Sequence, residues 1–371
     1  MIPSMTPPLL IISLSIFLHS SIAAPFDSLM DAHRGIGDLR FFVLGDIGGI
    51  PVLDTTFAQK KVAKSLLKRS KGMKAVVNLG DNFYFTGVMS DTDPRFKSRF
   101  EDVYKGMNVP WFTIAGNHDH FGDVNAQISY TSKSSFWKFP SSYYKQSFTE
   151  GNVTVDFVMI DTIDLCGNSV DVKSGDFFEV VAAEVKERLS GDSDMKPVDE
   201  KKAEEQWSWI EKILSESRGD YLFVGGHYPV YSISSHGPTP CLISRLVPLL
   251  EKYNVSVYFS GHDHSLQHMT RNGVTYVVSG AASRSDQSTS HRGTVLTQNV
   301  KVLYNYPKWS IRNLFSQLGF SDGGFVEMNV KKKEAHLLFL NKNGEVKYTS
   351  TVYPKGTLLN QSSAQEIQLE L

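Results

Sequence analysis

One pattern recurs five times along this chain and restricts the folds that it can adopt. Each time, a short run of apolar and β-favouring residues ends in glycine, and an aspartate, asparagine or histidine follows. In an α/β sheet such turns lie at the carboxyl ends of the strands, where ligands commonly bind. The five segments are "FFVLGD" ending at Asp46, "AVVNLGD" at Asp81, "WFTIAGNHD" at Asp119, "YLFVGGH" at His227 and "VYFSGHDH" at His264.

Helices and further strands are predicted around these five segments. The stretches 56–69, 200–216 and 242–253 have the apolar spacing and the residue types of helices. The last third of the chain alternates with a period of two, and its Asn343-Gly344 pair is typical of a hairpin turn. We therefore predict an α/β (α+β) fold in which two mixed β-sheets pack face to face and are flanked by helices.

The ends and the composition of the chain indicate an exported globular protein. Its 371 residues are 41% hydrophobic, contain no internal repeat, and carry 38 basic against 39 acidic side chains. We expect a monomer with one domain over 24–371 and no broad surface for nucleic acid. Residues 1–23 lack charged side chains, and their apolar run 9–18 is too short to span a membrane. They predict a signal peptide cleaved before Ala24, and so a secreted or lysosomal protein.

Together the five strand ends offer more metal ligands than one ion can use. A single Gly-Asp turn or a single histidine is usually structural, because the polar side chain satisfies the turn. Five such turns in one chain favour a pair of metal ions, and a cysteine-free donor set of nitrogen and oxygen suits phosphoryl transfer better than structural zinc. The candidate ligands are Asp46, Asp81, Asn117, His118, Asp119, His227, His262, Asp263 and His264.

The order of these blocks resembles one protein family. The chain contains, in this order, "GDIGG", "GDNFYFTG", "GNHDH", "GGHYPVYSISSHGPTPC" and "GHDHSLQH". This order is similar to that of the calcineurin-like metallophosphoesterases, and specifically of the small animal-type tartrate-resistant purple acid phosphatases. Tyr84, three residues after Asp81, is typical of the purple enzymes. The resemblance runs from about residue 38 to the final strands and implies a four-layer metallophosphoesterase fold.

The resemblance also implies a role for each candidate. By this likeness the Fe(III) ligands are Asp46, Tyr84 and His264, the ligands of a divalent ion are Asn117, His227 and His262, Asp81 bridges the two ions, and the catalytic histidines are His118 and His236. Anionic oxygen donors suit Fe(III), whereas an amide and two imidazoles suit Fe(II), Zn(II) or Mn(II). The other polar residues of these blocks, Asp119, His120, Asp263 and His268, are predicted to bond to ligands or to stabilise turns.

The implied reaction is acid hydrolysis of phosphate monoesters, such as phosphoproteins or nucleotides, by in-line attack of metal-bound hydroxide. Two alternatives stay open. One is a phosphodiesterase or nuclease that uses the same metal core, and the other is a non-catalytic secreted glycoprotein that only binds metal or a partner. The presence of all seven ligand positions and both outer histidines argues against the non-catalytic glycoprotein.

Two smaller features accompany the predicted export. Cys166 and Cys241 are either buried free thiols or, in an oxidising compartment, one disulfide, and the resemblance implies the disulfide. Acceptor sequons for N-glycosylation begin at Asn152, Asn254 and Asn360.

An acidic insert is predicted at about 167–205. Its stretch Asp171 to Glu205 holds 11 acidic and 6 basic residues. If this acidic segment lies beside the opening of the metal site, it would repel a phosphate ester and restrain activity until a protease cleaves the segment. The alternative is a solvated surface insertion with a helix near 177–189.

Overall fold

A computed structural model describes residues 38–49, 54–169, 182, 195–320 and 322–357. These residues belong to one compact unit, Gly37–Leu371. The predicted signal peptide, the sequon at Asn360 and nearly all of the predicted helix 177–189 therefore lie outside what the structure describes.

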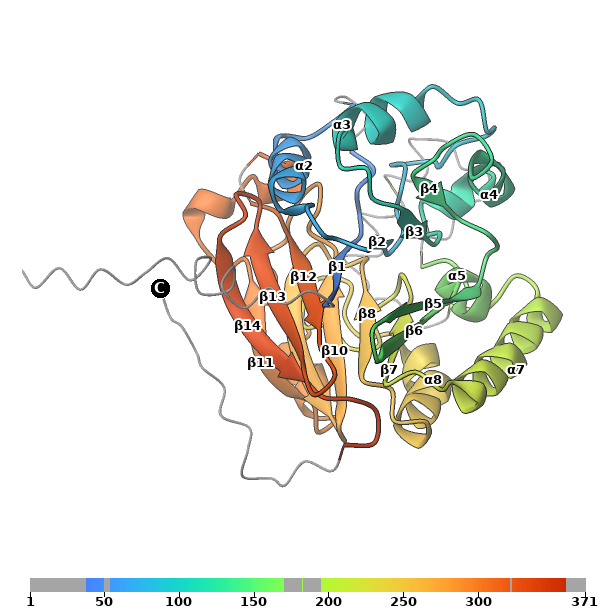
Figure 1. Ribbon diagram of the computed structural model, residues 1–371. Helices are drawn as coiled ribbons and strands as arrows, with labels where there is room; N and C mark the ends of the chain where they lie inside the picture. The colour runs from blue at the N-terminus through green and yellow to red at the C-terminus, as the bar shows by residue number, and fades with distance from the viewer. Residues whose placement is uncertain (1–37, 50–53, 170–181, 183–194, 321, 358–371) are drawn as a thin grey trace, which may run out of the picture. The chain divides into compact units, whose positions relative to one another are not determined.

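Two sheets of seven strands each form the centre of the described unit (Figure 1). The first sheet has the order β14 (Val346–Val352), β13 (Ala335–Asn341), β12 (Gly324–Val330), β1 (Leu39–Leu44), β2 (Ala75–Asn78), β3 (Trp111–Thr113) and β4 (Trp137–Lys138). The second has the order β11 (Lys301–Tyr306), β9 (Leu266–Arg271), β10 (Val274–Ser279), β8 (Val257–Ser260), β7 (Tyr221–Gly225), β6 (Val153–Met159) and β5 (Tyr144–Glu150).

Both sheets are mixed, as predicted. β1 pairs parallel with β2 and antiparallel with β12, and β10 pairs parallel with β8 and antiparallel with β9. The hairpin predicted at Asn343-Gly344 joins β13 to β14, and Gly344 adopts the positive φ of 83° that this turn requires. The predicted fold class is confirmed.

Helices cover the outer faces of the sheets. The longer ones are α2 (Phe57–Arg69), α4 (Val124–Tyr130), α7 (Glu200–Glu216) and α8 (Pro240–Lys252), and the short ones are α3 (Asp102–Tyr104), α5 (Thr162–Cys166) and α9 (Arg292–Leu296). A π-helical segment, η1 (Phe96–Glu101), and the 3₁₀ turns η2 (Asp119–Phe121), η3 (Ile311–Asn313) and η4 (Ser316–Leu318) complete the list. No helix of the described residues is long and apolar enough to cross a membrane.

The three predicted helices begin and end close to their expected residues. Thr56 caps α2 in a capping box with Gln59, and Val62 and Leu66 of that helix are buried. Asp199 caps α7 through its side chain. Pro240 starts α8 two residues before the predicted start, because proline fits the first turn of a helix.

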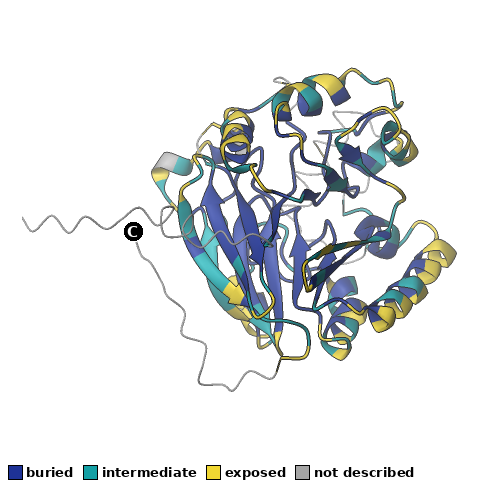
Figure 2. Cartoon of the chain, in the orientation of Figure 1, coloured by how far each residue is buried: buried dark blue, intermediate teal, exposed yellow. Residues whose placement is uncertain are grey.

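Apolar side chains fill the space between the sheets and beneath the helices. Phe41 of β1 lies 5.0 Å, between ring centroids, from Phe157 of β6, so the two sheets meet at this point. The other face of the second sheet packs against α7 and α8 through Trp207, Ile210 and Leu246. Figure 2 shows the consequence, buried strands between helices whose outer faces are exposed. This rigid core holds the strand ends, and the loops that follow them, in place.

Candidate metal centre

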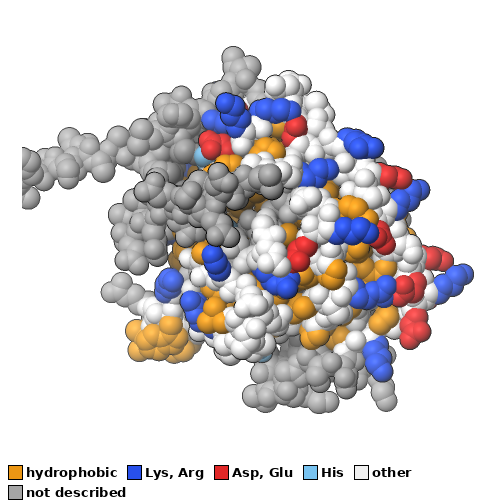
Figure 3. Space-filling view, turned by 90° about the horizontal axis from the view of Figure 1, so that it is seen from below, with side chains coloured by type: hydrophobic (Ala, Val, Ile, Leu, Met, Phe, Trp, Pro, Cys, Tyr) orange, Lys and Arg blue, Asp and Glu red, His pale blue; other side chains and the backbone are white. Residues whose placement is uncertain are grey.

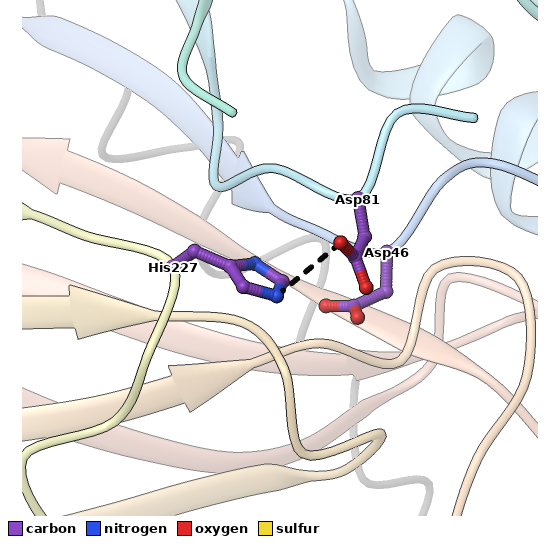
Figure 4. Close-up of side chains that lie close together, drawn as sticks. All are labelled: Asp46, Asp81 and His227. Atoms are coloured by element: carbon purple, nitrogen blue, oxygen red, sulfur yellow. Dashed lines mark ion pairs between the residues drawn. The ribbon is translucent and has the colours of Figure 1, made fainter. Parts of the chain in front are cut away.

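Five loops bring the predicted ligands together at the carboxyl ends of β1, β2, β3, β7 and β8. Asp46, Asp81 and His227 come from three of these loops, and one ligand atom of each lies within 4.8 Å of the other two (Figure 4). All seven predicted ligands are buried. The two sheets therefore contribute to one site, as expected when the carboxyl ends of parallel strands from both sheets lie close together.

One group of donors consists of Asp46, Tyr84 and His264. The Tyr84 hydroxyl donates to Asp46 Oδ1 at 2.7 Å and lies 3.1 Å from His264 Nε2. His264 Nε2 lies 3.3 Å from Asp46 Oδ1. A carboxylate, a phenol and an imidazole thus point to one place.

A second group surrounds His227. Its Nε2 lies 3.0 Å from Asn117 Oδ1 and 3.4 Å from Asp81 Oδ1, and its ring lies 5.1 Å from the ring of His262. His227 Nδ1 donates to the Leu79 carbonyl at 2.8 Å, which leaves Nε2 as the nitrogen that faces the cluster. Asp81 lies beside this group and is also close enough to Asp46 to serve both groups.

The backbone at the site adopts conformations that are rare for residues other than glycine. Asp46, Asp81 and His262 have φ values of 62°, 52° and 67°. Such left-handed residues concentrate at functional sites, where the fold imposes them. Gly261 is needed for close approach, because a Cβ atom there would lie 2.6 Å from Asp46 Oδ2.

The pKa shifts at the site have clear physical causes. Burial raises the pKa of Asp46 to about 7, and burial together with the charges of Asp46 and Asp81 raises the pKa of Tyr84 well above its usual value. Burial also acts to raise the pKa of Asp81, but the charges of His227 and His118 outweigh it and hold that pKa well below the usual value. Burial acts to lower the pKa of His227, but Asp81 outweighs it and raises that pKa to about 9.

These residues fit metal ions. Without a cation, a proton on His227 keeps Asp81 ionised, whereas burial favours the neutral forms of Asp46 and Tyr84. Metal ions would replace that proton and favour the phenolate, because metal ligands bind in their deprotonated forms. The donors are oxygen and nitrogen atoms only, as expected for iron, manganese or a catalytic zinc ion.

The two outer histidines lie beside different ligands. His118 Nδ1 donates to the Phe85 carbonyl at 2.6 Å, and its Nε2 is 4.0 Å from Asp81 Oδ2. The His236 ring lies 4.2 Å from the ring of His262 and lines a small pocket with Ser169, Met195 and Tyr228. Both imidazoles are therefore within reach of a ligand held at the cluster.

Three of the four residues predicted to have supporting roles bond to loops or a helix start beside the site. Asp119 accepts hydrogen bonds from Asn82 N and Gly116 N, and Asp263 accepts one from His236 N at 3.0 Å. His120 Nε2 lies 2.9 Å from Asp161 Oδ2. His268 is different, because it lies in the core against Tyr348, and burial lowers its pKa to about 4.

Arg284 is a site residue that the sequence reasoning missed. Its guanidinium lies 4.2 Å from the centroid of the Tyr84 ring, and its Nε is 3.2 Å from His264 Nδ1. It follows β10 by five residues, and no strand-end pattern marks it. Its position shortly after the strand 274–279 is a weak signal in the sequence that could have suggested it.

The cysteines and the ends of the acidic insert also lie beside the site. Cys166 and Cys241 form a disulfide, so the free-thiol alternative is excluded in this structure. Asn168 Nδ2 donates to the Asn117 carbonyl at 3.0 Å. A Cβ at Gly167, where φ is 100°, would overlap the Lys196 carbonyl oxygen, so these two residues of the insert are adjacent. Residues 170–181 and 183–194 between them are not described.

Comparison with known proteins agrees with the site. The family model for calcineurin-like phosphoesterases matches residues 39–266. The chain is 37% identical over 342 residues to tartrate-resistant acid phosphatase type 5 of Oryctolagus cuniculus, covering 90% of this chain and 95% of that protein. It is 39% identical over 316 residues to the same enzyme of Homo sapiens, covering 83% and 88%.

Solved structures show the same fold. One, titled "GAP50 the anchor in the inner membrane complex of Plasmodium", has a TM-score of 0.65 and 25% identity, covering 86% of this chain and 90% of that one. Purple acid phosphatase PPD1 from yellow lupin seeds has a TM-score of 0.53 and 16% identity, covering 85% of this chain and 54% of that one, and shows the fold alone.

The fold and the site together define a metallophosphoesterase, and the chain belongs to the calcineurin-like phosphoesterase family. Within that family it belongs with the tartrate-resistant, or purple, acid phosphatases, which hydrolyse phosphate monoesters at a dinuclear metal centre.

Proposed function

We propose that this enzyme is an exported acid phosphomonoesterase with an Fe(III) ion and a divalent ion, Fe(II), Zn(II) or Mn(II). The Fe(III) ligands are Asp46, Tyr84 and His264, and the divalent ion is held by Asn117, His227 and His262, with Asp81 between the two. The observation that carries the proposal is the approach of the Tyr84 oxygen to Asp46 and His264, since a buried phenol among anionic and imidazole donors suits Fe(III).

When bound, the metal pair would ionise a water at acidic pH and neutralise charge that develops on the phosphate. The chain's own residues have three tasks. Asp81 would keep the two donor groups at a fixed distance from each other, because its backbone and carboxylate are held between them. His236, held by Asp263, would donate the proton that the leaving alkoxide needs. His118, held by the Phe85 carbonyl, would bind a phosphate oxygen.

Two rivals are distinguished by assay. Steady hydrolysis of an aryl phosphate monoester, with little turnover of the matching diester, supports the phosphatase over a phosphodiesterase or nuclease. A solved relative is titled an anchor, so a non-catalytic role on this fold is the second rival. Seven buried ligand positions and two adjacent histidines support catalysis, because a purely structural role does not require them.

Metal analysis combined with a visible spectrum tests the proposal. We expect iron in the purified protein, and a violet colour from charge transfer between Tyr84 and Fe(III). Tyr84→Phe should remove the band, whereas Tyr228→Phe, a change beside His262 at a residue that is not a ligand in the proposal, should keep it. An active wild-type enzyme that contains no iron would refute the metal assignment.

We also propose that the protein is exported to the lysosome or the cell exterior. Residues 1–23 are proposed to be removed before Ala24, leaving a single catalytic domain over 24–371. Two of the three sequons, at Asn152 and Asn254, lie at exposed positions, as glycan attachment requires. The substrates proposed are phosphoproteins or nucleotides, and the expected state is a monomer. Amino-terminal sequencing of the mature protein and its mass before and after deglycosylation test the processing.

A further inference from the structure

A segment that hydrogen-bonds to Ser285, the residue after Arg284, exposes an unusual number of large apolar side chains. Between Pro307 and Phe320, six of them are 51% to 79% exposed. They are Trp309, Ile311, Leu314, Phe315, Leu318 and Phe320. Single exposed apolar residues are ordinary, but a contiguous group of this size on a protein surface marks a place of interaction. We call the surface formed by these six side chains the apolar surface.

The segment is held to the domain by its polar groups, which leaves its apolar side chains outside. Ser316 is buried, and its carbonyl accepts the Ser285 amide at 3.2 Å. The Ser310 amide donates to Gln287 Oε1 at 2.8 Å. The Gly319 carbonyl accepts the Ala58 amide of α2 at 2.9 Å. In an ordinary surface loop, apolar side chains pack against the domain and polar groups face solvent. Here polar groups make the contacts with the domain, so the apolar side chains are left exposed.

The sequence around the apolar surface contains more basic than acidic residues. From 287 to 321 the sequence contains no acidic residue and four basic ones, Arg292, Lys301, Lys308 and Arg312. Helix α2, whose first turn contacts Gly319, also contains no acidic residue and carries Lys60, Lys61, Lys64 and Lys68, while its last residue, Arg69, pairs with Glu327. The chain as a whole is nearly neutral, so this concentration of positive charge is local.

The space-filling view agrees with this distribution. Figure 3 shows Lys and Arg mixed with Asp and Glu over much of the face seen from below. At the lower left of that face, hydrophobic side chains gather in a dense group with Lys or Arg near them. On this face, an exposed apolar group therefore lies near basic side chains.

We propose that the apolar surface and the lysines of α2 form a peripheral docking site for membranes with anionic lipids. Tryptophan and phenylalanine favour the interface between headgroups and acyl chains, and lysines beside them attract anionic headgroups. A protein partner would need acidic groups and an apolar groove at matching positions. An anionic bilayer offers negative headgroups and an apolar interior over its whole surface. Binding of this kind needs no membrane-spanning helix, and it is independent of the phosphatase function.

Sedimentation of the full mature chain with vesicles tests the proposal. We expect binding to vesicles of phosphatidylcholine with phosphatidylserine, little binding to phosphatidylcholine alone, and weaker binding as salt rises. The pair Trp309→Ser and Phe315→Ser should weaken binding by roughly tenfold for each change. Lys60→Gln and Lys64→Gln should weaken it by about fivefold each.

Matched variants control for general effects of lost apolar or charged groups. Met89→Ser with Val198→Ser removes exposed apolar side chains elsewhere, and Lys201→Gln with Lys212→Gln removes exposed charges on α7. Neither pair should change vesicle binding, and every variant should keep its turnover of a soluble aryl phosphate. Tryptophan emission should shift to the blue on anionic vesicles, and Trp309→Phe should remove that shift.

Three outcomes would overturn the proposal. The first is no binding to either kind of vesicle, and the second is an equal loss of binding in the control pairs. The third is concentration-dependent self-association that the Trp309→Ser and Phe315→Ser pair abolishes, with no vesicle binding, since the apolar surface would then be an interface between protein chains.

Discussion

Asp119 joins two of the loops that carry the metal ligands. Its carboxylate accepts hydrogen bonds from Asn82 N at 3.0 Å and Phe83 N at 3.2 Å, on the loop after Asp81. It also accepts one from Gly116 N at 2.8 Å, beside Asn117. A single buried carboxylate thus fixes the distance between two ligand loops, and its loss should affect both stability and metal retention.

We therefore predict that Asp119→Asn lowers the free energy of unfolding by about 2–3 kcal/mol, because an amide cannot accept from all these donors. Metal should also dissociate faster into a chelator. Asp123→Asn is the matched control, since Asp123 caps α4 and asparagine caps equally well. Denaturant unfolding and the rate of metal loss measure both effects. If the two variants behave alike, Asp119 does not have this role.

At the scale of single residues, the sequence predicted the metal-ligand side chains better than it predicted the residues that contact them. Asp46, Asp81 and His262 could be predicted because a strand, a glycine and a polar residue follow one another in the chain. Arg284 could not, because its contacts with Tyr84 and His264 depend on how β10 pairs in the second sheet. Local patterns identify a ligand, whereas contacts between distant loops come from the tertiary fold.

At the element scale, one ion pair connects η2 to α5. Asp161 caps α5 by accepting from Ile163 N and Asp164 N, and its other oxygen lies 2.9 Å from His120 Nε2. Burial acts to lower the pKa of His120, but the charge of Asp161 outweighs it and raises that pKa. Burial acts to raise the pKa of Asp161, but His120 outweighs it and lowers that pKa.

These shifts give the pair a defined pH window. The contribution of His120 is fully present below its ordinary pKa of 6.5 and is lost as pH rises through its raised pKa. The contribution of Asp161 is present above its ordinary pKa of 3.8 and is lost as pH falls through its lowered pKa. The pair should therefore stabilise the protein most between pH 3.8 and pH 6.5.

We predict that His120→Gln lowers the free energy of unfolding by roughly 2 kcal/mol within this window and by less at alkaline pH. Melting temperatures of both proteins across this pH range measure the difference. His336→Gln removes a more exposed histidine, 3.2 Å from Glu334, and should have little effect at any pH. A destabilisation by His120→Gln that is constant with pH would argue against the ion pair.

The disulfide connects α5 to α8 across 75 residues of sequence. Closing a loop of this length restricts the unfolded chain, so replacing both cysteines by serine should lower the free energy of unfolding by about 4 kcal/mol. Denaturant unfolding of this variant and of the reduced wild type should give similar values. Equal stability of the oxidised and reduced wild type would contradict the prediction.

Elements were predictable where a local pattern is strong. Thr56 and Gln59 mark the start of α2, and Asn343-Gly344 marks the turn between β13 and β14. The order of strands was not predictable, because β1 pairs with β12 through partners such as Phe42 and Glu327 that are far apart in sequence. Such pairings depend on which apolar faces meet, and the alternation of residues does not specify the partner strand.

At the scale of the whole molecule, the beginning and the end of the described unit are held together. Glu327 of β12 lies 2.6 Å from Arg40 of β1 and 2.6 Å from Arg69 of α2. All three side chains are mostly buried. Because the two sheets share ligand loops and the last strands complete the first sheet, we expect the catalytic domain to unfold as one unit.

The metal centre lies where loops from both sheets meet, so its ions should stabilise the whole domain. Each bound ion favours the folded state by about 4 kcal/mol when it is present at a thousandfold excess over its dissociation constant. Removing both ions with a chelator should therefore lower the melting temperature by on the order of 10 °C, in a single transition. Calorimetry before and after chelation, with metal content measured in parallel, tests this. Asp81→Asn serves as the control, because a protein that has lost its shared ligand should already melt near the chelated value. An unchanged melting temperature after measured metal loss would mean that the protein scaffold alone holds the loops in place.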